Sequence, residues 1–280
     1  METSAMDVEA VLAAFDAQVR RSTNAESSGG AFERDGGVLR WVAPGTQVSM
    51  VVWSQLTGAS ADAAIAAQRA YFAARGTPVE WKYYDYDQPA DLPKRLLAAG
   101  YEAQAEELML VAETASISPQ VVLPDGVRLE PVTDQAGLET LLAVHALAFD
   151  DPVGDLGPRL AEQLRTAPDS LQLVVAMAGD EPVSAARVEF VPGTDFAGLW
   201  GGGTVPAWRG RGIFRALVVY RAGLAAARGY RYLQVDARPA SQPILQRLGF
   251  RAVATTTPYV FTPAGGGPGA AAREQGAARA

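Results

Sequence analysis

The residues with the clearest chemical potential lie in one loop, at positions 205–217. There Arg209 and Arg211 alternate with Gly210 and Gly212, and the sequence then takes on helical spacing. Glycine lets a backbone bring consecutive N–H groups close to one ligand. The N-terminus of a following helix adds unpaired N–H groups and a positive dipole end, and arginine side chains add charge. The loop is therefore predicted to hold a diphosphate.

The loop differs from two common phosphate-binding motifs. No Gly-Lys-Ser/Thr follows it, as a Walker A loop requires, and the G-x-G-x-x-G spacing of dinucleotide-binding folds is absent. The alternative interpretation is a solvated arginine-rich turn. An apolar segment at 196–205 precedes the loop and an apolar helical pattern follows it, which favours a strand–loop–helix unit that binds an anion.

Composition limits the class of protein. The chain has 280 residues, of which 49% are hydrophobic, enough for one large or two ordinary globular domains. Its formal charge of −7 argues against nucleic-acid binding. The absence of cysteine excludes disulfides, thiolate metal sites and a cysteine nucleophile, and a single histidine argues against a histidine metal cluster. No metal is expected.

The chain is expected to be cytoplasmic. No apolar run approaches the roughly 18 residues that a membrane helix needs. The first residues include Glu2, Asp7 and Glu9 and lack the basic character of a targeting leader. We therefore expect no membrane association.

Hydrophobic periodicity predicts alternating helices and strands, and thus an α/β fold with a mixed central sheet flanked by helices. Helices are expected at residues 7–21, 61–75, 92–99, 138–149, 156–164, 213–228 and 243–248. Strands are expected at residues 38–43, 48–56, 79–85, 107–112, 127–132, 171–177, 183–191, 196–205, 230–236 and 252–261.

An internal repeat divides the chain. Residues 70–76 and 79–85 are similar to residues 223–229 and 230–236, and residues 97–102 are similar to residues 246–251. Two tandem α/β units are therefore predicted, although chance similarity between alanine-rich helices is the alternative. The expected divisions are a first unit at 1–113, a linker at 114–126, a second unit at 127–262 and a disordered tail at 263–280.

The first unit lacks the arginine–glycine loop. At the corresponding place, residues 57–60 read Thr-Gly-Ala-Ser and contain no arginine. One unit is therefore expected to bind the anionic ligand, and the other to serve as a partner or a wall of the substrate site. Aromatic and acidic residues at 81–87 form either a receptor for a cationic amine or a structural strand with a solvated end.

The second half resembles the GNAT superfamily of acyl-CoA-dependent N-acyltransferases. The resemblance rests on the family's Arg/Gln-x-x-Gly-x-Gly/Ala loop, matched by Arg209, Gly212 and Phe214, and on the Leu-Gly-Phe at 248–250 that closes a later helix. It covers residues 127–262. Phe214 departs from the usual Gly/Ala. The first half looks like a degenerate copy, so the whole chain resembles a tandem GNAT protein.

The resemblance implies acetyl-CoA as cosubstrate. In the family the strand before the loop splays from the next strand, and pantetheine pairs with the strand backbone in the gap. The glycines at 201–203 suit a bulge and close approach of a ligand there. The implied cofactor-binding residues are Thr204 and Val205 for pantetheine, Arg209, Gly210, Arg211, Gly212, Ile213 and Phe214 for the diphosphate, and Arg215 for a phosphate.

Direct transfer of an acyl group from a thioester to an amine needs no enzyme nucleophile, which suits a chain without cysteine. A main-chain N–H near Val205 is expected to polarise the carbonyl. The tyrosine that often serves the family as general acid is matched here by Leu245, and the asparagine that often begins its motif by Arg238. Both of the usual side chains are therefore missing.

Two residues are candidates for the missing catalytic roles. Glu189 could act as a base through water, and Tyr259 could donate a proton; a surface carboxylate and a structural tyrosine are the alternatives. Asp236 and Ser241 are either ligand contacts or turn residues. His145 lies among helix apolar residues and is interpreted as structural.

The leading hypothesis is an acetyl-CoA-dependent N-acetyltransferase that transfers acetyl to an amine of a small molecule or protein by direct attack in a ternary complex. Its expected partners are acetyl-CoA and the amine acceptor, and it is expected to be a monomer or homodimer. The alternative is a non-catalytic acyl-CoA-binding or sensing module. A further idea is that the first half is an assembly surface.

Overall fold

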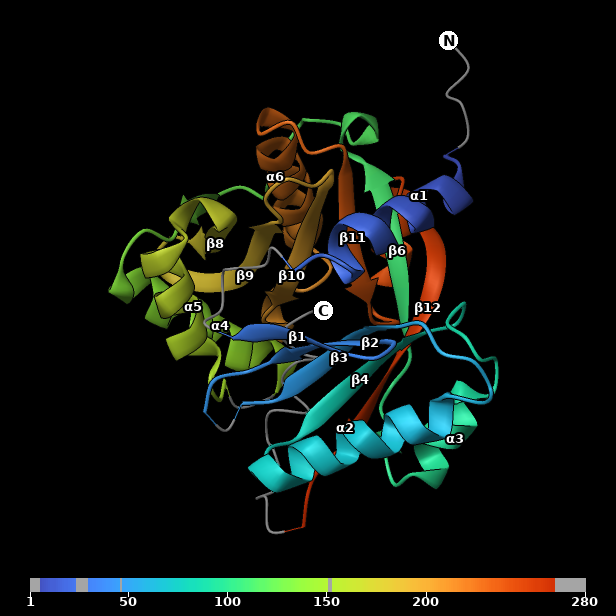
Figure 1. The fold of residues 1–280 in the computed structure, drawn as a ribbon. Coiled ribbons are helices and arrows are strands. Elements are labelled where there is room, and N and C mark those ends of the chain that lie inside the picture. Colours follow the sequence, from blue (N-terminus) through green and yellow to red (C-terminus); the bar gives the residue numbers. More distant parts are fainter. Residues whose placement is uncertain (1–5, 24–29, 46, 151–152, 265–280) are drawn as a thin grey trace.

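The structure is a computed structural model that describes residues 6–23, 30–45, 47–150 and 153–264. It contains one mixed sheet of 12 strands with helices on both faces (Figure 1). The strand order is β1-β2-β3-β4-β12-β6-β11-β10-β9-β8-β7, with the short β5 beside β12. The predicted α/β class with a mixed, helix-flanked sheet is confirmed.

The first half supplies six strands and three α-helices. The strands are β1 Ala31–Asp35, β2 Val38–Val42, β3 Ser49–Ser54, β4 Val79–Tyr84, β5 Glu102–Ala103 and β6 Glu107–Glu113. The helices are α1 Val8–Phe15, continued by a π-helical turn Asp16–Arg20, α2 Ala61–Arg75 and α3 Leu92–Ala98, followed by a 3-10 turn Thr114–Ser116.

The second half begins with a strand and two helices and then follows the order of the first half: three strands, a helix, a strand, a helix and a last strand, without a counterpart of β5. Its strands are β7 Val127–Pro131, β8 Leu171–Ala178, β9 Glu181–Phe190, β10 Phe196–Thr204, β11 Tyr232–Ala237 and β12 Arg251–Phe261. Its helices are α4 Gln135–Phe149, α5 Leu156–Thr166, α6 Ile213–Ala227 and α7 Gln242–Arg247, with 3-10 turns Pro168–Ser170 and Pro206–Trp208.

Each half contains a parallel pair of strands joined by a helix, which agrees with the internal repeat; the division into two tandem units stays a prediction. In the first half β3 pairs with β4 after crossing through α2, and in the second half β10 pairs with β11 after crossing through α6. Both parallel pairs are hydrogen-bonded in register over only three residue pairs. The strands of each pair therefore diverge toward their carboxyl ends.

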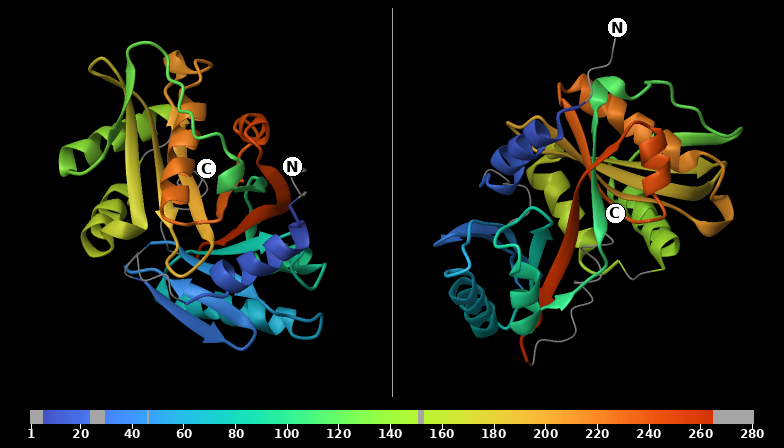
Figure 2. Two further views of the ribbon diagram at one scale, coloured as in Figure 1. Left: turned by 90° about the horizontal axis from the view of Figure 1, so that it is seen from above. Right: turned by 90° about the vertical axis from the view of Figure 1, so that its right-hand side faces the viewer.

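The two halves exchange their last strands. β6 of the first half lies between β11 and β12, and β12 of the second half lies between β4 and β6. Figure 2 shows these two strands crossing at the centre of the molecule. The sheet is therefore continuous through both halves, and the predicted unit boundaries at 113 and 127 stay a prediction.

Apolar side chains pack in layers on both faces of the sheet. α2 and α3 cover one face of the first half, where Ile65, Phe72 and Trp81 are fully buried. α6 covers β9–β11 in the second half, with Leu199 and Leu233 beneath it. On the opposite face α1 packs near the middle of the sheet, and α4 and α5 pack on β8–β10.

The elements match the predicted ranges closely, with two strands omitted. The structure adds the two-residue β5 and also β1, an edge strand whose residues are all partly or fully exposed, so that its sequence lacks an apolar alternation. Among the described helices, none is long and apolar enough to cross a membrane. The predicted disorder of the tail falls mostly on residues 265–280, which lie outside the described residues.

Candidate functional site

A wedge opens between β10 and β11. The strands are in register from Phe196 and Tyr232 only as far as Gly198 and Gln234, although β10 continues to Thr204. A register shift on the β9 side of β10 lies between Trp200 and Gly203. The wedge is the gap that the family resemblance implies for pantetheine.

The glycine run at 201–203 is required by its surroundings. Gly201 has a φ of +56°, a conformation that side chains disfavour. A methyl group on Gly202 would lie 2.9 Å from the Phe214 ring, and one on Gly203 would lie 2.8 Å from the Phe149 ring. Helices α6 and α4 therefore pack closely against opposite faces of β10, and the Phe214 ring of α6 packs against the strand at Gly202.

The predicted diphosphate loop leads directly into α6. Gly210 and Gly212 have φ values of 76° and 85°, so both adopt the left-handed conformation for which glycine is suited. Gly212 caps α6, and no side chain accepts a hydrogen bond from the N–H groups of the first helical turn. These N–H groups and the positive end of the helix dipole therefore have no side-chain acceptor, and their binding of a diphosphate stays a prediction.

Arg209 is already engaged by main-chain oxygens. Its Nε donates to the carbonyl of Thr204 at 3.0 Å, and its Nη2 donates to the carbonyl of Ala148 at 2.8 Å, in the last turn of α4. A cation at a helix C-terminus is favourable. Arg209 thus fixes the loop to the end of α4, and its contact with a diphosphate stays a prediction.

Arg211 and Arg215 are free to meet a ligand. Both side chains are exposed. Arg211 stacks on Trp208 at 4.5 Å from the ring centroid and makes one long contact of 3.4 Å with the carbonyl of Ala207. No hydrogen bond or ion pair of Arg215 is found within the described part of the chain. They are therefore the arginines best placed to supply charge to the loop.

The N–H of Val205 itself is paired in the structure. It donates to the carbonyl of Val183 at 3.0 Å and so holds the end of β10 to β9. A main-chain N–H near Val205 as the group that polarises the thioester carbonyl stays a prediction. Thr204 is also bonded, through Oγ1 to the Ser184 hydroxyl at 2.8 Å.

The two predicted catalytic residues lie in different parts of the molecule. Glu189 on β9 stands opposite Gly198, the last residue of β10 that pairs with β11, and its side chain is 34% exposed. It accepts a hydrogen bond from Arg187 Nε at 2.9 Å. Tyr259 is buried in the core of the first half, with its ring 6.1 Å from that of Tyr83. Glu189 therefore lies close to the point where β10 and β11 begin to diverge, whereas Tyr259 does not.

A buried charge network joins the two halves and was not foreseen from the sequence. Lys82 Nζ on β4 lies 2.8 Å from Asp236 Oδ2 on β11 and 3.7 Å from Glu107 Oε2 on β6. Gln234 donates to the other oxygen of Asp236 at 2.8 Å. The signal was a pair of charged residues, Glu80 and Lys82, in a strand otherwise made of apolar and aromatic residues. The partners of Lys82 come from strands whose pairing no local pattern reveals.

Burial controls the charges of this network. It raises the pKa of Glu107 to about 7, and the attraction of Lys82 offsets this only in part. The pKa of Lys82 is raised, because the pull of Asp236 and Glu107 outweighs the burial that would lower it. Asp236 is the penultimate residue of β11, so the network borders the carboxyl end of the wedge.

Cationic and neutral groups surround the bulge of β10. Arg221 of α6 is buried and donates to the carbonyls of Leu217 and Arg187 at 3.0 and 2.8 Å, and burial next to Arg187 lowers its pKa to about 9. His145 packs against Phe149, with ring centroids 4.5 Å apart. Burial, reinforced by Arg187, lowers the pKa of His145 to about 4, so it is neutral at pH 7 and suits a structural role.

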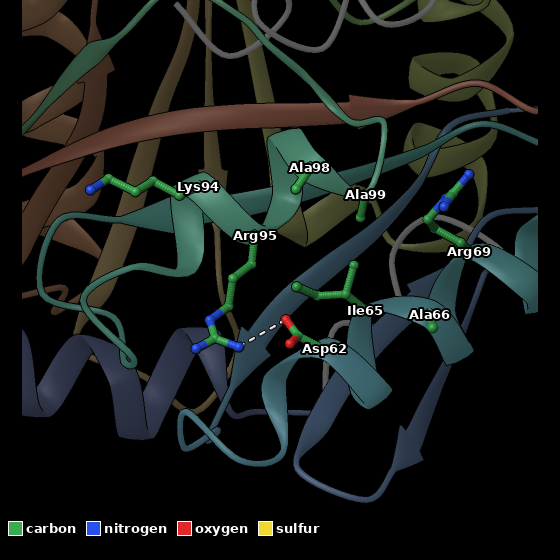
Figure 3. A pocket seen from close by; sticks show the side chains of 8 residues that line it. All are labelled: Asp62, Ile65, Ala66, Arg69, Lys94, Arg95, Ala98 and Ala99. Atoms are coloured by element: carbon green, nitrogen blue, oxygen red, sulfur yellow. Dashed lines mark ion pairs between the residues drawn. The ribbon is translucent and has the colours of Figure 1, made fainter.

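The first half has no equivalent loop. Residues 57–60 close on themselves, because Ser60 Oγ accepts from the Thr57 N–H at 2.9 Å. A pocket of about 500 Å³ lies between α2 and α3, and Arg95 extends across it to Asp62 at 2.8 Å (Figure 3). Arg95 also pairs with Asp91 at 3.0 Å, so its charge is balanced within the chain.

Comparison with known proteins agrees with this geometry. Residues 138–250 match the model described as "Acetyltransferase (GNAT) family". No curated protein sequence matches the chain. The matched segment begins in α4 and ends just before β12, so it contains the loop, the wedge and α6. These residues form a domain of the GNAT acetyltransferase family.

Solved structures share the fold over most of the chain. A GCN5-related N-acetyltransferase from Kribbella flavida has a TM-score of 0.69 and 18% identity, covering 91% of this chain and 96% of that one. Another from Sphaerobacter thermophilus has a TM-score of 0.58 and 15% identity, covering 80% and 76%. A tandem GNAT protein from the clavulanic acid biosynthesis pathway has a TM-score of 0.56 and 12% identity, covering 93% and 89%. The chain therefore has the GNAT fold, and one of the similar structures is a tandem GNAT protein. Within the described residues, no group of three or more side chains suits a metal ion.

Proposed function

We propose that the protein is an acetyl-CoA-dependent N-acetyltransferase that acts on an amine of a small molecule or a protein. The observation that carries the proposal is the divergence of β10 and β11 directly before a loop that opens the N-terminus of α6. The wedge offers unpaired strand backbone to pantetheine, and the loop offers N–H groups to the diphosphate. The GNAT domain at 138–250 supports this use of the two features.

The reaction is a direct transfer in a ternary complex. The amine nitrogen attacks the thioester carbonyl carbon, the carbon–sulfur bond breaks, and the thiolate leaves and takes up a proton. The amine must lose a proton, and the proposed acceptor, through water, is Glu189; its position opposite Gly198, where β10 and β11 begin to diverge, and its partial exposure support this role. Its hydrogen bond from Arg187 would orient the carboxylate. The location of Tyr259 in the first half's core favours a structural role for that residue over proton donation.

Binding is tested by calorimetry with acetyl-CoA. The double variant Arg211→Ala/Arg215→Ala is expected to weaken binding at least about tenfold, because both guanidinium groups lie at the loop and are not needed for packing. Arg165→Ala is the matched control, since Arg165 is 70% exposed on α5 and away from the loop. No binding by the unaltered protein, or equal binding by all three proteins, would overturn the proposal.

A non-catalytic acyl-CoA-binding module is the second candidate. It is favoured by Leu245, which stands where the family often has its catalytic tyrosine and which is buried among apolar residues of the core. Release of free thiol from acetyl-CoA in the presence of an amine panel separates the two functions. Turnover of any amine excludes the second candidate, and Glu189→Gln should then lower the rate without weakening acetyl-CoA binding.

A further inference from the structure

A pocket of about 280 Å³ lies beside the diphosphate loop, and one of its walls is the segment that joins the two halves. This wall consists of Gln120, Val122, Leu123 and Pro124. The facing wall comes from the loop and from the first two turns of α6. The pocket is therefore built by two segments that are almost one hundred positions apart in the chain.

The chemistry of the pocket is divided between its walls. Val122 is 64% exposed although its side chain is apolar, whereas Val219 of α6, which also lines the pocket, is only 4% exposed. Arg211 and Arg215 stand at the loop end, and no carboxylate lines the pocket. In a chain with a formal charge of −7, an unbalanced cationic site next to apolar surface suits a ligand with a flat ring and a phosphate.

We propose that the linker forms one wall of the binding site for the nucleotide end of acyl-CoA. This inference rests on the proposed function. Gly212 belongs both to the pocket and to the loop that opens α6, so a ring packed against Val122 would bring its diphosphate to the helix N-terminus. The pocket lies at the lower end of the size range of small-ligand sites, which suits part of a cosubstrate.

The arrangement makes binding depend on both halves. The linker begins after β6, which is an inner strand between β11 and β12, and it ends at β7 on the far edge of the sheet. A ligand that contacts the linker therefore holds a segment anchored at two distant places in the sheet. The inter-half connection would be part of the cosubstrate site as well as a covalent tether.

Calorimetry with CoA, adenosine 3′,5′-bisphosphate and pantetheine as separate probes tests the inference. Val122→Asp places a negative charge in the pocket and should weaken CoA and adenosine 3′,5′-bisphosphate at least about tenfold, while binding of pantetheine stays unchanged. Val121→Asp is the matched control, because Val121 is the adjacent exposed residue and is not part of the pocket lining. CoA should also slow hydrogen exchange at residues 120–124.

The outcomes distinguish failure of the linker proposal from failure of the proposed acetyl-CoA-dependent function. If the unaltered protein binds CoA and the two variants bind it equally well, the linker is not part of the site and the inference fails alone. Equal exchange at residues 120–124 with and without CoA would have the same meaning. If the unaltered protein binds none of the three probes, the inference and the proposed function both fail.

Discussion

Arg209 Nη2 donates a hydrogen bond of 2.8 Å to the carbonyl oxygen of Ala148, and so joins the diphosphate loop to the last turn of α4. The same guanidinium also holds the carbonyl of Thr204 at the end of β10. The arginine that carries the family motif therefore stabilises three elements at once. This relationship separates its role from that of the exposed arginine two positions later.

Arg209→Ala is expected to lower the free energy of unfolding by about 1–3 kcal/mol, because two main-chain carbonyls lose a charged donor. Arg211→Ala should change it by no more than about 0.5 kcal/mol, since that side chain is exposed. Urea unfolding measures both. Equal stability of the two variants would show that the contacts of Arg209 do not hold the loop.

Lys82→Met is expected to lower the free energy of unfolding by about 3–5 kcal/mol, because Asp236 would remain buried without its cation and Glu107 would keep only Arg238, at 3.8 Å. Lys94→Met serves as control, since Lys94 is an exposed lysine of the same half. The two variants are compared by urea unfolding at neutral pH. A loss for Lys82→Met no larger than that of the control would mean that the network contributes little to joining the halves.

Glu107 and His145 should make contributions of opposite pH dependence to the free energy of unfolding. The pKa of Glu107 is raised to about 7, so its contribution is complete below the ordinary value of 4.5 and is lost as the pH rises to 7. The pKa of His145 is lowered to about 4, so its contribution is present above the ordinary value of 6.5 and is lost as the pH falls to 4. The two slopes oppose each other over most of the same pH range.

When one of the two groups is removed, the pH dependence of the unfolding free energy should follow the contribution of the other. Glu107→Gln should lose stability more steeply than the unaltered protein as the pH falls from about 7 to 4, and His145→Gln should lose less or gain. The change is at most about 1.4 kcal/mol per pH unit for one proton. Unfolding free energies measured across this range check the sign, and parallel curves for all three proteins would contradict the assignment.

Gly203→Ala tests the packing of the wedge. The new methyl group would meet the Ala148 Cβ and the Phe149 ring at 2.8 Å, so we expect a loss of about 1–3 kcal/mol and weaker acetyl-CoA binding as β10 shifts. Gly223→Ala in α6 is the control, because nothing lies within 4 Å of its added methyl group. That change should instead stabilise the helix by about 1 kcal/mol. If Gly203→Ala binds acetyl-CoA as tightly as the unaltered protein, the added methyl group on β10 does not disturb the wedge.

The helices and strands were largely predictable because each carries its own signal. The predicted helix at 61–75 coincides with α2, and Gly76 ends it in the left-handed conformation with a φ of 65°. The loop at 205–217 was predictable for the same reason, since its glycines, arginines and following helix are contiguous.

Features made by distant segments could not be predicted in this way. The bond between Lys82 and Asp236 spans 154 positions and depends on which strands become neighbours in the sheet. The role of Arg209 was equally hidden, because a carbonyl and a phosphate oxygen both accept from a guanidinium, and only the position of α4 distinguishes them. A motif therefore identifies the loop, while the fold decides what each of its arginines does.

The exchange of β6 and β12 predicts that neither half folds alone. A fragment of residues 1–126 would leave β4 without β12, and a fragment of residues 127–280 would leave β11 without β6, so each would expose an unpaired inner strand edge. We expect each fragment to aggregate or to lack a cooperative thermal transition, and the two fragments expressed together to copurify as a folded 1:1 complex. Circular dichroism and size-exclusion chromatography with light scattering measure these outcomes. A cooperative, monomeric fragment of residues 127–280 would show that the second half completes its sheet without the first, and the continuous sheet would then not be a requirement for folding.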